Sequence, residues 1–141
     1  MKTAHGTGLL DEPAVSGVAL LTASGTPLVL HGELDGGAAG PGVDWPGFAA
    51  AAGVILRHAA EDPEAAAPLA AHTEGLSLGA LRFALLRVGL ADIDATGTAE
   101  SDFVLKLAAL PWRLLVVVLG DKRDAARLRE VTDELADRIR A

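Results

Sequence analysis

The segment Gly75-Leu76-Ser77-Leu78-Gly79 has the G-x-S-x-G spacing of a nucleophile elbow. In that motif a strained turn from a strand into a helix exposes the serine to a histidine base, and the histidine follows the serine in the chain. All four histidines of this sequence precede Ser77, and Ala71-His72-Thr73-Glu74 is a poor apolar strand to launch such a turn. We therefore interpret Ser77 as a surface or capping hydroxyl and expect no catalytic serine.

The segment Asp92-Ile93-Asp94-Ala95-Thr96-Gly97 has oxygen-bearing side chains at alternate positions and glycine at the sixth, as an EF-hand loop does. The twelfth position, where that loop needs a bidentate glutamate, is Phe103. The histidines lie at least 14 residues apart and lack the short pairing of a helical metal site. We therefore interpret the segment as a polar hairpin loop and expect no metal.

Other cofactor and nucleic-acid signals are also lacking. The sequence has no P-loop, no glycine fingerprint between a strand and a helix, and no cysteine. Its net charge is −7, from 12 basic and 19 acidic residues, which argues against binding phosphate backbones. Residues 1–70 carry two basic and eight acidic side chains, a net charge of −6, so a basic partner would meet this half. We expect an interaction module with no catalytic residue and no cofactor.

The first half of the chain is expected to contain a β-hairpin and a helix. Apolar runs predict strands at Gly17–Ala23 and Pro27–His31, with Gly25 in the turn between them. A glycine-rich loop at 32–43 follows. Asp44 is placed to cap a helix over Trp45–Ala60, whose many alanines allow close approach of another element.

The second half predicts strands and a final helix. Leu78 to Val88 fits either a helix or a strand by periodicity, and the polar stretch 89–101 is typical of a turn region. Alternation predicts a strand at Phe103–Ala109. The segment Trp112–Leu119, which is continuously apolar after Arg113, predicts a central strand. Asp62-Pro63 either ends the first helix or starts a second, short helix at 63–71. The apolar stripe from Ala125 to Ile139 predicts a final helix over 121–141.

Size and hydropathy favour one globular domain over residues 1–141, with residues 1–13 as a flexible or short helical arm. The longest purely apolar run, 114–119, has six residues, far fewer than the roughly 20 that cross a bilayer. The first ten residues lack the apolar stretch of a signal peptide. We expect a cytoplasmic protein with no membrane span.

The element order strand, strand, helix, three strands, helix, with the opening hairpin of residues 17–30 and its turn residue Gly25, resembles the Roadblock/dynein light chain family. That family is related to the longin and profilin-like folds, and the likeness spans about residues 14–140. It implies that Leu81–Val88 is a strand. The expected fold is α+β, a five-stranded antiparallel sheet flanked by helices in the order β-β-α-β-β-β-α.

The same resemblance implies a function. Such proteins are dimeric scaffolds in which third strands pair edge to edge and the first long helices pack together, and bacterial members partner small Ras-like GTPases. The expectation is a non-enzymatic homodimeric regulatory or scaffold module; the alternative is a small-ligand sensor of profilin-like or PAS-like shape. The residues expected at the dimer or partner interface lie on the first long helix and the third strand: Phe48, Ala52, Ile55, Leu81, Phe83 and Leu85.

Overall fold

The computed structural model of the chain describes residues 13–35, 42–61, 76–79, 81–89, 91–98 and 102–140. The expected arm before Pro13, the short helix at 63–71 and the middle of the glycine-rich loop lie outside these ranges.

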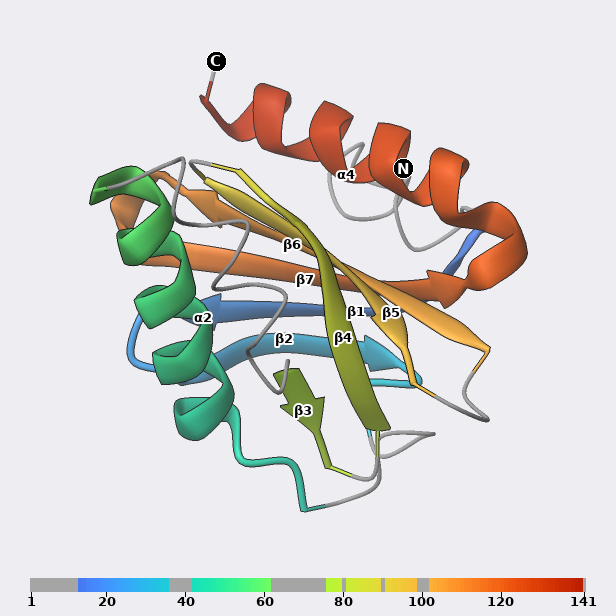
Figure 1. Cartoon of the computed structure of the whole chain (residues 1–141), viewed down its shortest axis with the longest axis horizontal. Helices are drawn as coiled ribbons and strands as arrows, with labels where there is room; N and C mark the ends of the chain where they lie inside the picture. Colours follow the sequence, from blue (N-terminus) through green and yellow to red (C-terminus); the bar gives the residue numbers. More distant parts are fainter. Residues whose placement is uncertain are drawn as a thin grey trace, which may run out of the picture.

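A single antiparallel sheet of seven strands runs through the molecule, in the spatial order β2-β1-β7-β6-β5-β4-β3 (Figure 1). Strands that are neighbours both in the sheet and in the sequence form hairpins. β1 also pairs with β7, so the first and the last strand of the chain lie side by side. The strands are β1 (Val15–Thr22), β2 (Pro27–Gly32), β3 (Leu76–Leu78), β4 (Leu81–Val88), β5 (Asp92–Gly97), β6 (Phe103–Leu110) and β7 (Leu114–Asp121).

The expected five-stranded sheet is wrong, because β3 and β5 are additional strands. The chain order is β-β-α-β-β-β-β-β-α, although the class remains α+β. The segment Asp92–Gly97 has the polar composition of a loop, yet it pairs with both β4 and β6. Polar side chains occur inside this sheet because cations on neighbouring elements neutralise them. β3 has only three residues, too few to show a period in the sequence.

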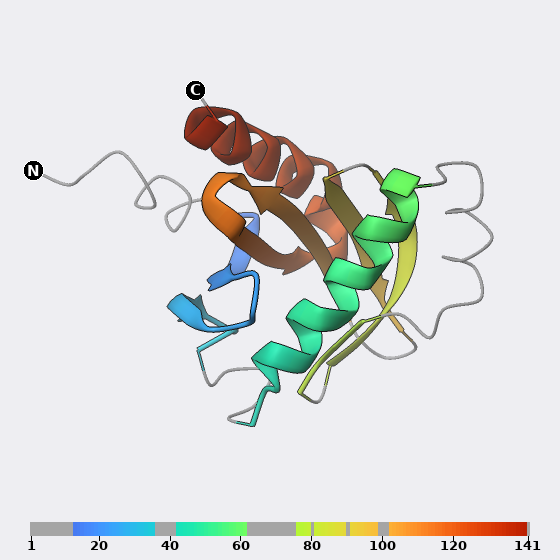
Figure 2. The same cartoon turned by 90° about the vertical axis from the view of Figure 1, so that its left-hand side faces the viewer.

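Two helices cover opposite faces of the sheet, as Figure 2 shows. The helix α2 (Trp45–Glu61) packs on one face and α4 (Ala125–Arg140) on the other, and both confirm predicted helices. Strand alternation divides the apolar side chains into two cores. On β6, Leu105 and Leu107 belong to the α2 side, whereas Val104 and Ala108 belong to the α4 side. Within the described ranges, no helix is long and apolar enough to cross a membrane.

The β6–β7 connection differs from the predicted strand start at Trp112. Trp112 and Arg113 adopt left-handed backbone angles, with φ of 62° and 58°, and form a one-turn 3-10 segment with Pro111. This conformation is costly for residues other than glycine, and it leaves the Trp112 side chain exposed. The last strand therefore begins at Leu114.

Candidate interaction surfaces

All six residues expected at a dimer interface contact the molecule's own core. Phe48, Ala52 and Ile55 are buried between α2 and the sheet, with Ala52 completely inaccessible. Phe83 is buried in the same cluster, and Leu81 and Leu85 pack against it. A partner can reach only the outward residues of these elements. Those residues include Ala50, Ala51 and Val54 on α2, and Leu86 on β4.

The strand β4 is covered on its outer side only at its start. Leu81, Arg82 and Phe83 pair with β3. On the inner side, Phe83 to Val88 pair with β5, with a bulge between Leu85 and Arg87. From Ala84 to Val88 no strand among the described segments pairs with the outer edge. The Leu86 side chain at the bulge is 64% exposed. Within the described ranges, β4 therefore has an open half-edge that carries an apolar side chain.

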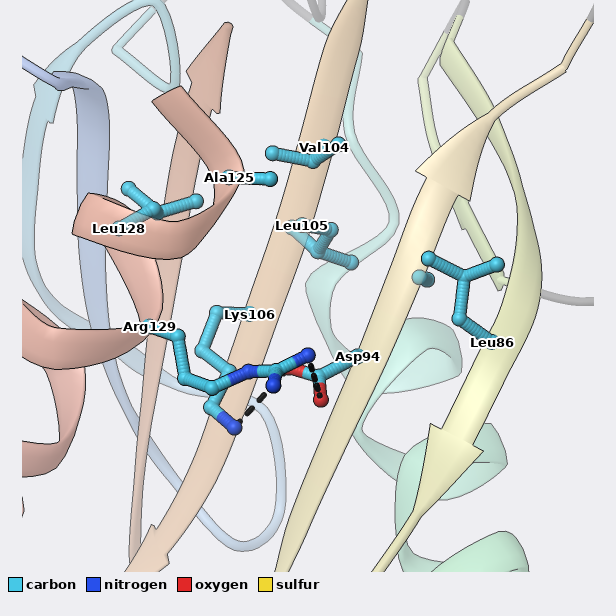
Figure 3. Close-up of a pocket in the computed structure, with 9 residues that line it drawn as sticks. Leu86, Asp94, Val104, Leu105, Lys106, Ala125, Leu128 and Arg129 are labelled. Carbon is cyan, nitrogen blue, oxygen red and sulfur yellow. Dashed lines mark ion pairs between the residues drawn. The ribbon is translucent and has the colours of Figure 1, made fainter. Parts of the chain in front are cut away.

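A group of buried charges connects the α4 face of the sheet to α4. Lys106 is 2% exposed on β6, and its Nζ lies 2.7 Å from Asp92 Oδ2 and 2.9 Å from Asp94 Oδ1, both on β5. Asp94 and Lys106 are direct cross-strand partners. From α4, Arg129 Nη2 lies 3.2 Å from Asp94 Oδ2 (Figure 3). The helix is thus held to the sheet by ion pairs as well as by apolar packing.

Arg87 completes this charged group from β4. Its Nε donates to Asp94 Oδ2 at 2.9 Å, and its guanidinium also pairs with Asp92. The hydrogen bond to Asp94 is the main cause that raises the pKa of Arg87. Burial disfavours the charged form of Asp92, but the hydrogen bonds and charges of Lys106 and Arg87 outweigh it and hold the pKa of Asp92 below its usual range.

One feature of the sequence indicates this charged group. Lys106 is the only charged residue in the apolar strand Phe103–Leu110. A charge in a buried strand requires opposite charges nearby, and the two aspartates of the preceding hairpin supply them. The segment was expected to be a polar hairpin loop, but its carboxylates lie in a strand and bind side-chain cations. Over the ranges that the structure covers, no group of three metal-ligating residues is assembled.

Next to this charged group lies a hollow of about 40 Å³. Leu86, Asp94, Lys106, Leu128 and Arg129 are among the residues that line it (Figure 3). Ligand pockets usually measure roughly 300–1,000 Å³, so this hollow does not support the alternative of a small-ligand sensor. The acidic and basic side chains that line the hollow form ion pairs with one another. They are not arranged as a nucleophile beside a general base.

Ser77 lies on β3 and its side chain is exposed. It pairs through the backbone with Arg82 on β4, and Gly79 forms the turn between the two strands with a φ of 59°. A nucleophile elbow leads from a strand into a helix, whereas this serine lies in a hairpin. The interpretation of Ser77 as a surface hydroxyl is confirmed.

No family model and no curated protein matches the chain. Solved structures do match. Profilin IA of Acanthamoeba castellanii superimposes with a TM-score of 0.63 at 19% identity, covering 94% of this chain and 86% of the profilin. Profilin of Schizosaccharomyces pombe gives a TM-score of 0.62 at 16% identity, covering 93% and 89%. A Roadblock/LC7 domain from Streptomyces avermitilis gives 0.49 at 18% identity, covering 95% and 90%.

The two profilin matches show that the chain has a profilin-like α+β fold. The profilin-like relationship that the sequence resemblance included is confirmed for the fold. Fold alone assigns no activity. The function must therefore be argued from the surfaces described above.

Proposed function

We propose that this chain is a non-enzymatic regulatory or scaffold module that acts as a homodimer. The observation that carries the proposal is the open outer edge of β4 from Ala84 to Val88. Unpaired backbone donors and acceptors at a sheet edge are a template for another strand. A second copy offers the same edge, and a two-fold axis through it joins two sheets into one.

The outward side of α2 supports this arrangement. The helix packs next to β3 and β4, so it lies on the same side of the molecule as the open edge (Figure 2). Its exposed residues Ala50 and Ala51 are small, and Val54 is an apolar side chain that is 58% exposed. Small residues let two helices approach closely, and in a two-fold dimer each copy presents the same patch. The dimer face of α2 is therefore its outward side, opposite to Phe48, Ala52 and Ile55.

The oligomeric state tests the proposal. Multi-angle light scattering across a dilution series should give about twice the chain mass of 14.4 kDa. Val54→Glu places a charge in the proposed contact and should yield a folded monomer. Val29→Glu on β2 is the matched control, because Val29 is a similarly exposed valine, 47% accessible, at the other end of the sheet. A monomeric parent at tens of micromolar, or an unchanged Val54→Glu dimer, would contradict the proposal.

The partner class belongs to the same proposal. A small Ras-like GTPase is the partner that the Roadblock resemblance implies, and a dimer could present two equivalent sites to it. Titration calorimetry with GDP-loaded and GTP-loaded GTPases from the same genome should show binding that prefers one nucleotide state. If neither nucleotide state binds, the proposal of a GTPase partner is wrong, and the proposal of a homodimer is unaffected.

A further inference from the structure

The half-edge of β4 that no described strand covers, residues 84–88, contains a β-bulge at its centre. The pairing of β4 with β5 shifts register between Leu85 and Arg87, which leaves Leu86 as one extra residue on β4. A bulge bends its strand, increases the local twist and re-aims a side chain. The side chain at this bulge is Leu86, which is 64% exposed. The shape of the open half-edge therefore depends on how the bulge is held.

Arg87, the residue directly after the bulge, is tied to two carboxylates of β5. Its Nε donates to Asp94 Oδ2 at 2.9 Å, and its guanidinium also pairs with Asp92 Oδ2. Asp94 is held from two further elements, since Lys106 Nζ lies 2.9 Å from its Oδ1 and Arg129 Nη2 lies 3.2 Å from its Oδ2 (Figure 3). The carboxylates are thus fixed from several sides, and Arg87 is the member of the charged group that lies on the open half-edge.

Gly89, directly after β4, leaves room for this contact. A Cβ atom at that position would collide with Asp92 Oδ1 and would lie 3.2 Å from Arg87 Nη1. The φ angle of Gly89 is not positive, so what glycine supplies here is space and not a left-handed backbone. The end of β4 therefore has no side chain where the Arg87–Asp92 pair forms.

Folding stability does not account for Arg87. Its side chain is 48% exposed, and ion pairs of exposed groups contribute little to stability. Without it, Asp94 would keep Lys106 and Arg129 as partners. What Arg87 fixes is the position of the bulged segment relative to β5.

We propose that Arg87 is a positioning residue for the homodimer: it holds the bulge at Leu86 in one conformation and thereby fixes the register in which a second copy pairs with β4. This inference rests on the proposed homodimer. A flat edge is prone to register slips, whereas a bulge pins the register. With the two-fold axis at Leu86, the middle of the open half-edge, Ala84 of one copy lies opposite Val88 of the second copy and the two Leu86 side chains meet.

Amide hydrogen exchange tests the positioning role without using the dimer. In the Val54→Glu background, or in the parent if the parent is monomeric, Arg87→Met should speed exchange of the β5-paired amides of residues 84–88 by about tenfold, because local opening sets these rates. Arg129→Met is the matched control. It removes a cation of similar exposure, 55%, from the same Asp94 Oδ2, but from α4 and not from the edge. It should leave these rates unchanged.

Two further variants separate the geometry of Arg87 from its charge. Arg87→Lys keeps the charge but replaces the planar fork by a single ammonium, so it should give an exchange rate between those of the parent and Arg87→Met. Gly89→Ala displaces the Arg87–Asp92 contact without removing a charge. It should speed exchange of the same amides, and it answers the question if Arg87→Met does not fold.

Disulfide cross-linking measures the register in the dimer. The chain has no cysteine, so Ala84→Cys and Leu86→Cys each supply a single thiol. Residues directly opposite in an antiparallel pair have Cα atoms about 4.5–5.5 Å apart, which a disulfide can span. In an oxidised equimolar mixture, disulfides between two copies of position 86 should exceed those that involve position 84 by about fivefold. Adding Arg87→Met to both variants should abolish this preference, whereas adding Arg129→Met should preserve it.

Three outcomes would overturn the proposal while the homodimer stands. The first is exchange at residues 84–88 that neither Arg87→Met nor Gly89→Ala changes. The second is a preference for position 86 that survives Arg87→Met, and the third is a parent dimer that cross-links mainly at position 84. A parent mass of 14.4 kDa in light scattering would instead show that the homodimer itself is wrong, and the register role with it.

Discussion

Lys106 shows how much one buried charge constrains its neighbours. Its ammonium touches two carboxylates of β5, and Asp94 in turn accepts from Arg87 on β4 and pairs with Arg129 on α4. Breaking a buried ion pair by removing one member is far more costly than the pair is stabilising, since the remaining charge keeps its desolvation cost. The side chain of Lys106 is therefore expected to be essential to the fold.

Lys106→Met should lower the free energy of unfolding by about 3 kcal/mol, in the range seen when a buried pair loses one partner. Methionine preserves most of the volume, so the loss reports the Asp92 and Asp94 carboxylates, which keep only their arginine partners, and not a cavity. Urea unfolding at pH 7 measures it. Lys122→Met is the control, because Lys122 is exposed, and it should change stability by less than about 0.5 kcal/mol. Equal effects of the two substitutions would contradict this account.

The pKa of Asp92 predicts how the free energy of unfolding decreases as the pH falls. Its pKa is lower in the folded protein than in the unfolded chain, so between these two values the unfolded chain binds more protons. The stabilisation is fully present above about pH 5, because the unfolded pKa is about 3.9, and it is lost as the pH falls through the folded pKa. Asp92→Asn should lower stability at pH 7 and flatten its decline between about pH 5 and pH 2. Urea unfolding at several pH values over this range measures it. If the free energy of unfolding of Asp92→Asn declined with falling pH as steeply as that of the parent, the prediction would be wrong.

Elements with a strong local pattern could be predicted from the sequence, and those that depend on distant partners could not. Both long helices and the first hairpin follow from caps, apolar stripes and a turn glycine. β5 could not be recognised, because its Asp92 and Asp94 are polar and their cations come from β4, β6 and α4. The outward and inward sides of α2 were also indistinguishable, since alanines occur on both. Which side packs on the sheet depends on strands far away in the chain.

Neighbouring alanines on α2 separate its two sides. Ala52→Arg should unfold the protein, because Ala52 is fully buried between α2 and the sheet and an unpaired buried charge costs several kcal/mol. Ala51→Arg should leave a folded protein, because Ala51 is exposed, and on the proposed dimer face it should yield a monomer. For both variants, circular dichroism measures whether the protein is folded, and light scattering measures its mass. A folded Ala52→Arg protein would show that the packing of α2 is misassigned.

At the scale of the whole molecule, the sheet has two different ends. Among the described residues, the β4 end has an open half-edge next to the outward side of α2, and β2, which has a bulge at Leu28, is the outermost strand at the other end. The sequence predicted the α+β class and a profilin-like relationship, which the profilin matches support as a fold. It could not predict that β3 extends the sheet beyond β4, because three residues are too few to show a period. The proposed dimer interface lies at this end of the sheet.

Dimerisation through the β4 end should make stability depend on protein concentration. A partner that binds only the folded chain raises the apparent stability by mass action, so the melting temperature should rise with concentration from about 1 to 100 μM. Val54→Glu should remove this dependence and leave the low-concentration melting temperature nearly unchanged, because Val54 is exposed in the single copy. Val29→Glu, at the β2 end, should retain the dependence of the parent. Scanning calorimetry over this range decides the matter: a parent melting temperature that does not vary with concentration would mean that the β4 edge is not closed by a second copy.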